Sequence, residues 1–329
     1  MEFLLGLLPV CVFLSALYLM DSYKLIPVLS LGWSLVAGCG AAVTAFLVNM
    51  ILSNLTGLSF DPFSRYVAPV TEETLKAALI VRLLLTRRTG FLVDTAIHGF
   101  AIGAGFALVE NTGYFLTLGS SSMLLWIVRG FGTAMMHGAA TSIAGIIGKT
   151  LTERAGSASA ATVLPGVGAA IVIHSAFNHF FLTAVTTTQL IILVLPILMG
   201  LVFRRSEKSV RRWLGVGFDT DRELLEMITT GRLRETKIGE FFQTLESRFR
   251  GEVLADMVCM LRLHLELAIA AKGILLMRES GFELPPDPEW KEQLAELQYL
   301  EQSIGRTGIL AVEPFLHTSR HQLAQLLRV

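Results

Sequence analysis

Charged residues are scarce in the first part of this chain of 329 residues. Residues 1–203 contain 17 of them, 8 acidic and 9 basic, whereas residues 204–329 contain 37. Only 16% of the whole chain is charged, compared with about 25% in soluble domains, and the mean hydropathy is +0.60. We therefore predict that residues 1–203 form a transmembrane bundle and that residues 204–329 form a soluble helical domain.

Several other features are missing. The formal net charge is zero, so nothing in the overall charge favours binding of nucleic acid. The three cysteines, Cys11, Cys39 and Cys259, are far apart and form no CxxC pair, which argues against a disulfide framework or a cysteine metal site. The chain starts with Met1-Glu2 and lacks the basic region of a signal peptide, so we expect an uncleaved first helix.

Long apolar runs are present instead. A hydrocarbon layer of about 30 Å requires roughly 20 apolar residues per helix, and seven segments come close to this length. They are residues 3–20, 25–52, 67–85, 91–118, 123–151, 160–185 and 187–203. The third contains Glu72, Glu73 and Lys76, which a membrane helix can carry if they face other protein. The sequence thus predicts an all-α, polytopic membrane helix bundle of about seven spans.

Basic residues indicate how the bundle is oriented in the cell membrane. Lysine and arginine concentrate at cytoplasmic helix ends, and with seven spans the basic clusters fall on one side. These clusters are Lys24, Arg87 with Arg88, Lys149 with Arg154, and Arg204, Arg205, Lys208, Arg211 and Arg212. We therefore expect the N-terminus outside the cell and the C-terminal domain in the cytoplasm.

The charged tail has a helical pattern but no catalytic or nucleotide-binding motif. Asp221 can cap a helix at its start, and residues 252–277 have the length of a longer helix. The proline-rich run 284–288 separates this helix from a final one at 289–303. We expect the domain to regulate the membrane part or to form an oligomer.

Ionisable side chains inside the apolar segments are the most informative feature. Each costs roughly 2.5–3.5 kcal/mol at the bilayer centre if it faces lipid, so such groups must face one another or a water-filled cavity. They include Glu72, Glu73, Lys76, Glu110 and Arg129, and four histidines, His98, His137, His174 and His179, lie in the same region. Their concentration predicts one polar site inside the bundle.

Spacing suggests which of these groups share a helix face. Glu72 and Lys76 are four residues apart and can pair, while Glu73 projects about 100° away toward another helix. His174 and Asn178 are also one turn apart. A carboxylate near a lysine can act as a general base, a histidine can bind a metal or polarise water, and an asparagine amide can donate to an oxyanion.

Four short motifs occur in order between residues 67 and 180. They are Glu72-Glu73-x-x-Lys76, Phe106-x-x-x-Glu110, the segment from Arg129 to His137, and His174-x-x-x-Asn178. In order and spacing they resemble the motifs of the PrsW family. That family is similar to a larger set of membrane proteases that includes the CAAX prenyl endopeptidases and bacteriocin-processing enzymes. Those relatives typically have EExxxR as the first motif, so Lys76 favours the PrsW branch.

The resemblance implies a hydrolase, an endopeptidase that cleaves peptide bonds within or beside the membrane. PrsW proteins are similar to site-1 proteases, which cut the extracytoplasmic part of a single-span anti-sigma factor, so the implied substrate is a single-span membrane protein. The implied catalytic residues, all in the bundle of residues 1–203, are Glu72, Glu73, Lys76, Glu110, Arg129, His137, His174 and Asn178. Within this set, Asn178 or Arg129 would stabilise the oxyanion.

Two mechanisms remain open at this point. In one, Glu72 or Glu73 activates water as the general base without a metal ion. In the other, Zn²⁺ is bound by residues such as Glu73, Glu110, His137 and His174. The chain has no HExxH motif, which excludes a site-2-type zinc protease. A transporter or a non-catalytic membrane receptor would also carry charges in its helices, but we find no convincing repeat of the transporter kind.

Overall fold

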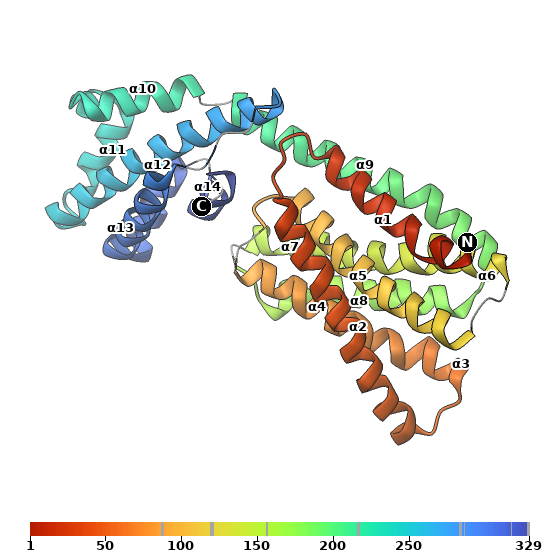
Figure 1. Ribbon diagram of the computed structural model, residues 1–329. Coiled ribbons are helices and arrows are strands. Elements are labelled where there is room, and N and C mark those ends of the chain that lie inside the picture. Colours follow the sequence, from red (N-terminus) through yellow and green to blue (C-terminus); the bar gives the residue numbers. More distant parts are fainter. Residues whose placement is uncertain are drawn as a thin grey trace. The chain divides into compact units, whose positions relative to one another are not determined.

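The computed structural model describes residues 1–86, 89–118, 122–155, 157–215, 218–282, 285, 287–316 and 318–327 (Figure 1). All regular elements in these ranges are helices, which confirms the all-α prediction. The chain divides into two compact units, Met1–Ser206 (unit 1) and Glu207–Val329 (unit 2). Arg87 and Arg88, two of the residues that indicate the orientation of the bundle, lie outside the described residues.

Unit 1 is a bundle of long helices joined by short turns. Its α-helices are α1 (Glu2–Met20), α2 (Val28–Thr56), α3 (Phe60–Pro62), α4 (Ala68–Leu85), α5 (Leu92–Leu118), α6 (Met123–Ile127), α7 (Met135–Ala155), α8 (Ala160–His179) and α9 (Ala184–Gly215), the last of which continues into unit 2. Gly57 ends α2 in the left-handed conformation with φ 62°, and a capping box at Ser159 starts α8. These local signals determine where the chain reverses direction.

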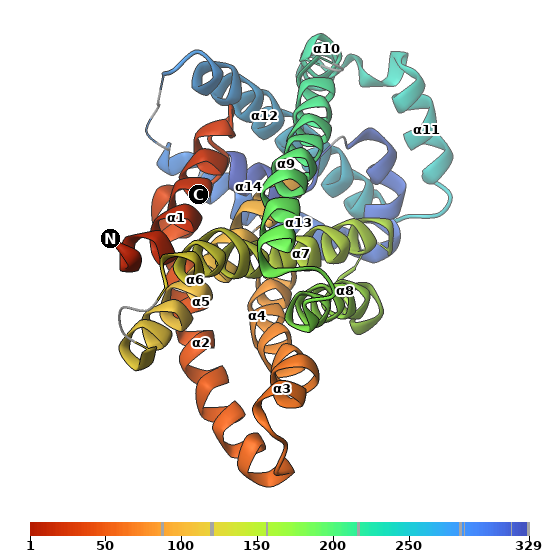
Figure 2. The ribbon, with the colours of Figure 1, turned by 90° about the vertical axis from the view of Figure 1, so that its right-hand side faces the viewer.

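Among the residues that the structure describes, five helices are long and apolar enough to cross a membrane, namely α1, α2, α5, α8 and the Ala184–Arg211 part of α9. The third and fifth predicted spans contain α4 and α7, which do not belong to this group. In α4 the reason is charge, because its 18 residues include Glu72, Glu73 and Lys76. The seven-span count therefore stays a prediction. Helix α4 nevertheless lies inside the bundle, between α2 and α8 (Figure 2).

Helix α5 is the central element of unit 1, since it packs against α1, α2, α4 and α7. Glycines allow the helix backbones to approach closely. A Cβ atom at Gly105 would lie 2.0 Å from the carbonyl oxygen of Leu35 in α2. A Cβ atom at Gly103 would lie 2.3 Å from the carbonyl oxygen of His137 in α7. Both positions exclude a side chain, and the second places α7 against α5 at the level of His137.

Two helices of unit 1 are preceded by a π-helical segment. The segment η1 (Phe63–Val67) leads into α4, and η2 (Val128–Ala134) leads into α7. Hydropathy predicts one regular helix over residues 123–151, so the π-helical turn of η2 differs from that prediction. Such turns are rare and often lie at functional sites. In η2, a Cβ atom on Gly130 would lie 1.9 Å from the carbonyl oxygen of α1 Leu5, and one on Gly132 would lie 2.4 Å from the hydroxyl of α9 Thr188. Close contacts with α1 and with α9 therefore restrict the position of η2.

Unit 2 is a helical domain with its own core. Its elements are α10 (Phe218–Thr229), η3 (Arg232–Glu235), α11 (Lys237–Leu245), α12 (Gly251–Glu279), α13 (Pro288–Val312), η4 (Glu313–Phe315) and α14 (Arg320–Leu327). Helix α12 packs against α10, α13 and α14. Its buried Lys272 ammonium donates to the carboxylate of Asp221 over 2.8 Å. Asp221 thus lies inside α10 rather than at its N-cap, because its carboxylate neutralises a buried cation.

We predict that Gly103→Ala destabilises unit 1, because the added methyl group meets the α7 backbone at His137. Overpacking of this kind costs about 1–3 kcal/mol, which a lower midpoint of thermal unfolding in detergent would report. Gly113→Ala on the same helix is the matched control, since no atom lies within 4 Å of a Cβ at that position. Equal midpoints for the two variants would contradict the close packing of α5 and α7.

Candidate functional site

The structure places seven of the eight predicted site residues in one cluster inside unit 1. Helix α4 provides Glu72, Glu73 and Lys76, and the other four are Glu110 of α5, Arg129 of η2, His137 of α7 and His174 of α8. Glu72, Glu110 and Arg129 are partly exposed, and the rest of the cluster is buried. Three carboxylates, two imidazoles and two cations therefore meet in the interior of an apolar helix bundle.

The Glu73 carboxylate lies at the centre of this cluster. Its Oε1 atom accepts from Lys76 Nζ over 2.6 Å and from His174 Nδ1 over 2.8 Å. Spacing alone predicts that Lys76 pairs with Glu72, but Lys76 pairs with Glu73, three residues earlier. The reason is the direction of the Glu72 side chain, which turns toward α2 and α8. Glu73 thus forms a buried ion pair within α4 and links α4 to α8 through the imidazole of His174.

His137 is held between Lys76 and Glu110. Its Nδ1 atom lies 2.9 Å from Lys76 Nζ, and its Nε2 atom lies 2.8 Å from Glu110 Oε2. A lysine ammonium only donates, so Nδ1 accepts and Nε2 carries the hydrogen that Glu110 accepts. The Lys76 ammonium also lies 4.5 Å from the centre of the Phe106 ring, a favourable cation–π contact. Because both ring nitrogens are engaged, His137 can bind a metal ion only by giving up one of these hydrogen bonds.

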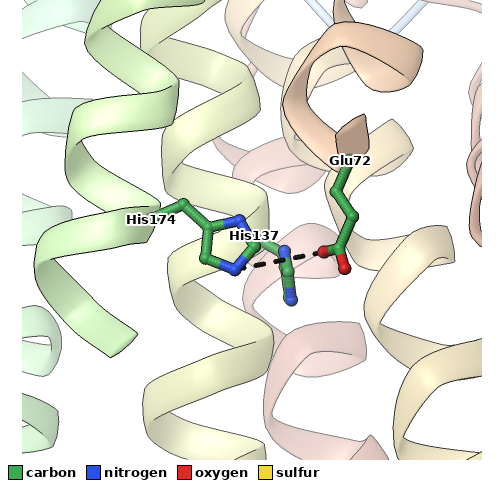
Figure 3. Close-up of side chains that lie close together, drawn as sticks. All are labelled: Glu72, His137 and His174. Carbon is green, nitrogen blue, oxygen red and sulfur yellow. Dashed lines mark ion pairs between the residues drawn. The ribbon is translucent and has the colours of Figure 1, made fainter. Parts of the chain in front are cut away.

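His174 and Glu72 leave ligand atoms directed at one another. Figure 3 shows their side chains reaching from α8 and α4 toward a common point, with His137 beside them. The Nε2 atom of His174 lies 4.0 Å from Glu72 Oε2. Since Glu73 accepts the hydrogen on His174 Nδ1, the Nε2 atom presents a lone pair. Asn49 of α2 donates to the other oxygen of Glu72 over 3.2 Å and orients that carboxylate.

Arg129 and Glu110 form the third part of the cluster. Arg129 Nη2 lies 3.3 Å from Glu110 Oε1, and its Nε donates to Asn111 Oδ1 over 2.9 Å. The guanidinium lies over the Tyr114 ring, 3.6 Å from its centre. Asn111 in turn donates to the carbonyl oxygen of Gly6 in α1 over 2.7 Å. Asn111 is absent from the predicted set, although an amide directly after Glu110 in an apolar helix was a usable signal.

Asn178, the eighth predicted site residue, contacts a different part of the fold. Its Nδ2 atom donates to the carbonyl oxygen of Ser64 in η1 over 2.8 Å, because the end of α8 packs against η1. Two further histidines in the apolar segments also lie apart from the cluster. His98 pairs with a serine of α2, and His179 contacts a tyrosine of η1. The cluster therefore uses two of the four histidines singled out in the sequence.

The residues present fit a divalent metal ion. Glu72, His137 and His174 each offer one ligand atom, and these atoms lie within 4.8 Å of one another. Two histidines and a carboxylate form the ligand set of one class of catalytic zinc site. Two ligands of one zinc ion lie at most about 4.2 Å apart, given bonds of about 2.1 Å, so side-chain rotations that release one hydrogen bond of His137 would bring all three into range. Glu72 thus replaces Glu73 and Glu110 of the ligand set considered from sequence.

The arrangement has the chemistry of hydrolysis. A partly exposed carboxylate can take a proton from water, a metal ion can activate that water, and an arginine can stabilise developing negative charge. The fold and the cluster together define a membrane-embedded hydrolase with a candidate metal centre.

The chain belongs to the PrsW family of intramembrane metalloproteases, which it matches over residues 26–202, more than half of its length. This match confirms the expected resemblance, the assignment as a protease, and the multi-pass membrane location. Comparisons with curated proteins and with solved structures found no match.

We predict that the purified protein binds a divalent metal ion and that Glu73→Gln weakens this binding about 10- to 100-fold. The neutral amide would hold Nδ1 of His174, the ring nitrogen that faces away from the candidate metal site, less firmly than the carboxylate does. Competition with a chromophoric zinc chelator measures the affinity. His98→Gln is the control, because that buried histidine lies outside the cluster. A His174→Ala variant with wild-type affinity would show that the metal binds elsewhere.

Proposed function

We propose that the protein is an intramembrane endopeptidase that hydrolyses a peptide bond of a single-span membrane protein at this Glu/His cluster, with zinc held by Glu72, His137 and His174. The observation that carries the proposal is the convergence of these three residues from α4, α7 and α8 beside the Glu110 carboxylate. When bound, zinc would act as a Lewis acid and make water nucleophilic near neutral pH.

Glu73 has an orienting role in this proposal. Its side chain is 1% exposed, and its Oε1 atom already accepts from Lys76 and His174. A carboxylate that is shielded from water to this extent is poorly placed to take a proton from it. It instead fixes the ring of His174, as carboxylates commonly do behind metal-binding histidines. Lys76 neutralises the Glu73 carboxylate and fixes the ring of His137.

Glu110 is the general base in this proposal. Its side chain is 24% exposed, and one of its oxygens lies beside the His137 ring that faces the candidate metal site. Glu110 would take a proton from the attacking water and deliver it to the leaving amine. Arg129, 3.3 Å from the other oxygen, orients this carboxylate and supplies positive charge for the oxyanion. Neither Glu72 nor Glu73 is as suitable, since the first holds the metal and the second is buried.

The substrate and the orientation are part of the same proposal. Seven spans, like five, place the two ends of unit 1 on opposite sides of the membrane, and the basic end of α9 favours the cytoplasm for unit 2. In that orientation Glu72 and Glu73 lie near the outer end of α4. This location supports cleavage in the extracytoplasmic part of the substrate, for which an anti-sigma factor is the candidate. Unit 2 would regulate the protease or form an oligomer.

We predict that Glu110→Gln lowers cleavage about 10²- to 10⁴-fold, the usual loss when a general base is removed. The amide preserves the shape of the side chain but cannot take a proton from water. Mass spectrometry of membrane-protein fragments in cells that produce the wild-type or the variant protein identifies the substrate. Cleavage of the purified substrate then gives the rate.

Glu153→Gln is the matched control for this experiment. It makes the same chemical change at the end of α7, where the Glu153 side chain is 51% exposed and pairs with Lys149 at the surface. We expect this variant to cleave like the wild type. Identical fragment patterns for wild type and Glu110→Gln would overturn the proposed mechanism, in which Glu110 is the general base.

A further inference from the structure

The segment that introduces α4 contains carbonyl groups that a proline leaves without their regular donors. Pro69 lies in the first turn of α4 and has no N–H group. The Arg65 carbonyl, four residues earlier, therefore lacks its α-helical donor, and the Ser64 carbonyl, five residues earlier, lacks its π-helical donor. The N–H group of Ala68 is already used by Phe63. Shielded carbonyl groups need partners, and another element can supply the donors.

The last turn of α8 supplies these donors. Ser175 Oγ donates to the carbonyl oxygen of Arg65 over 2.6 Å, and Asn178 Nδ2 donates to that of Ser64 over 2.8 Å. The ring of His179 stands edge-on to the tyrosine that follows in η1, with ring centres 4.9 Å apart. Three residues of α8 thus contact three successive residues of η1.

This contact joins two elements that carry site residues. Ser175 directly follows His174, and η1 leads directly into the helix of Glu72 and Glu73. The hydrogen bond from His174 to Glu73 connects α8 directly with α4. The bonds from Ser175 and Asn178 to η1 connect α8 with the segment that precedes α4. Two separate attachments restrict rotation of α4 about its own axis. That rotation determines whether Glu72 faces His174.

We propose that Ser175 and Asn178 are positioning residues that hold η1 and thereby place Glu72 and Glu73 opposite His174. The proposal rests on the proposed function, because it concerns the same site. Asn178 then acts through η1, because its amide nitrogen donates to the Ser64 carbonyl in that segment. Ser175 has no counterpart among the sequence-predicted site residues, and its role depends on the missing N–H of Pro69.

Kinetics of two Ser175 variants test the proposal. Ser175→Ala removes the hydroxyl, and we expect kcat to fall about tenfold at unchanged KM, because misplaced groups slow the chemical step. Ser175→Thr keeps a hydroxyl and should restore kcat to within about twofold of the wild type. Thr117→Ala is the control, since this exposed hydroxyl donates only within its own helix. Unchanged kcat in Ser175→Ala, or equal losses in the Ala and Thr variants, would overturn the proposal.

A double-mutant cycle tests whether Ser175 and Asn178 act on the same segment. If both hold η1, the double alanine variant should lose less activity than the product of the two single losses, because residues that share a partner are coupled. Independent effects would overturn the shared role and would favour direct contact of Asn178 with the substrate.

Hydrogen exchange separates this proposal from the proposed function, because it requires no cleavage. Amides in residues 63–71 should exchange faster in Ser175→Ala than in the wild type and at the wild-type rate in Ser175→Thr. A wild-type protein that cleaves nothing would overturn the proposed function. A wild type that cleaves, with unchanged exchange and kcat in Ser175→Ala, would overturn the positioning role alone.

Discussion

The buried ion pair between Glu73 and Lys76 is the interaction on which the site depends. The two side chains are 1% and 0% exposed, so the protein must replace the hydration that both charges lose. Removing one partner of such a pair costs about 3–5 kcal/mol. The same two groups also bond to Nδ1 of His174 and Nδ1 of His137. One ion pair therefore orients both imidazoles.

The surrounding helices must be close and irregular for this pair to have partners. Gly103 brings the α7 backbone against α5 at His137, and the π-helical segments precede the two helices that carry Glu73 and His137. In hydrocarbon, water cannot compensate an unpaired charge. The contacts that satisfy these charges are therefore the same contacts that assemble the candidate site.

The helical bundle and most of the cluster could be predicted because charges in apolar segments have few stable alternatives to meeting one another. Their individual contacts could not be predicted. Lys76 pairs with Glu73 and not with Glu72 because of the side-chain rotamers, which the sequence does not reveal. The hydrogen bond from Asn178 to Ser64 depends on a π-helical turn, which the hydropathy pattern does not predict. A criterion based on the length of apolar segments also fails to detect a membrane helix that carries several charges, as α4 would be. Seven spans and the orientation stay predictions.

X-ray absorption at the zinc edge of the purified, zinc-loaded protein tests the central claim most directly, because it reports the metal ligands without requiring a substrate. Convergence of α4, α7 and α8 predicts nitrogen and oxygen ligands at about 2.0–2.2 Å. It also predicts the multiple-scattering pattern of two imidazoles, those of His137 and His174. A spectrum with sulfur ligands, or without imidazole, would contradict a metal centre at this cluster.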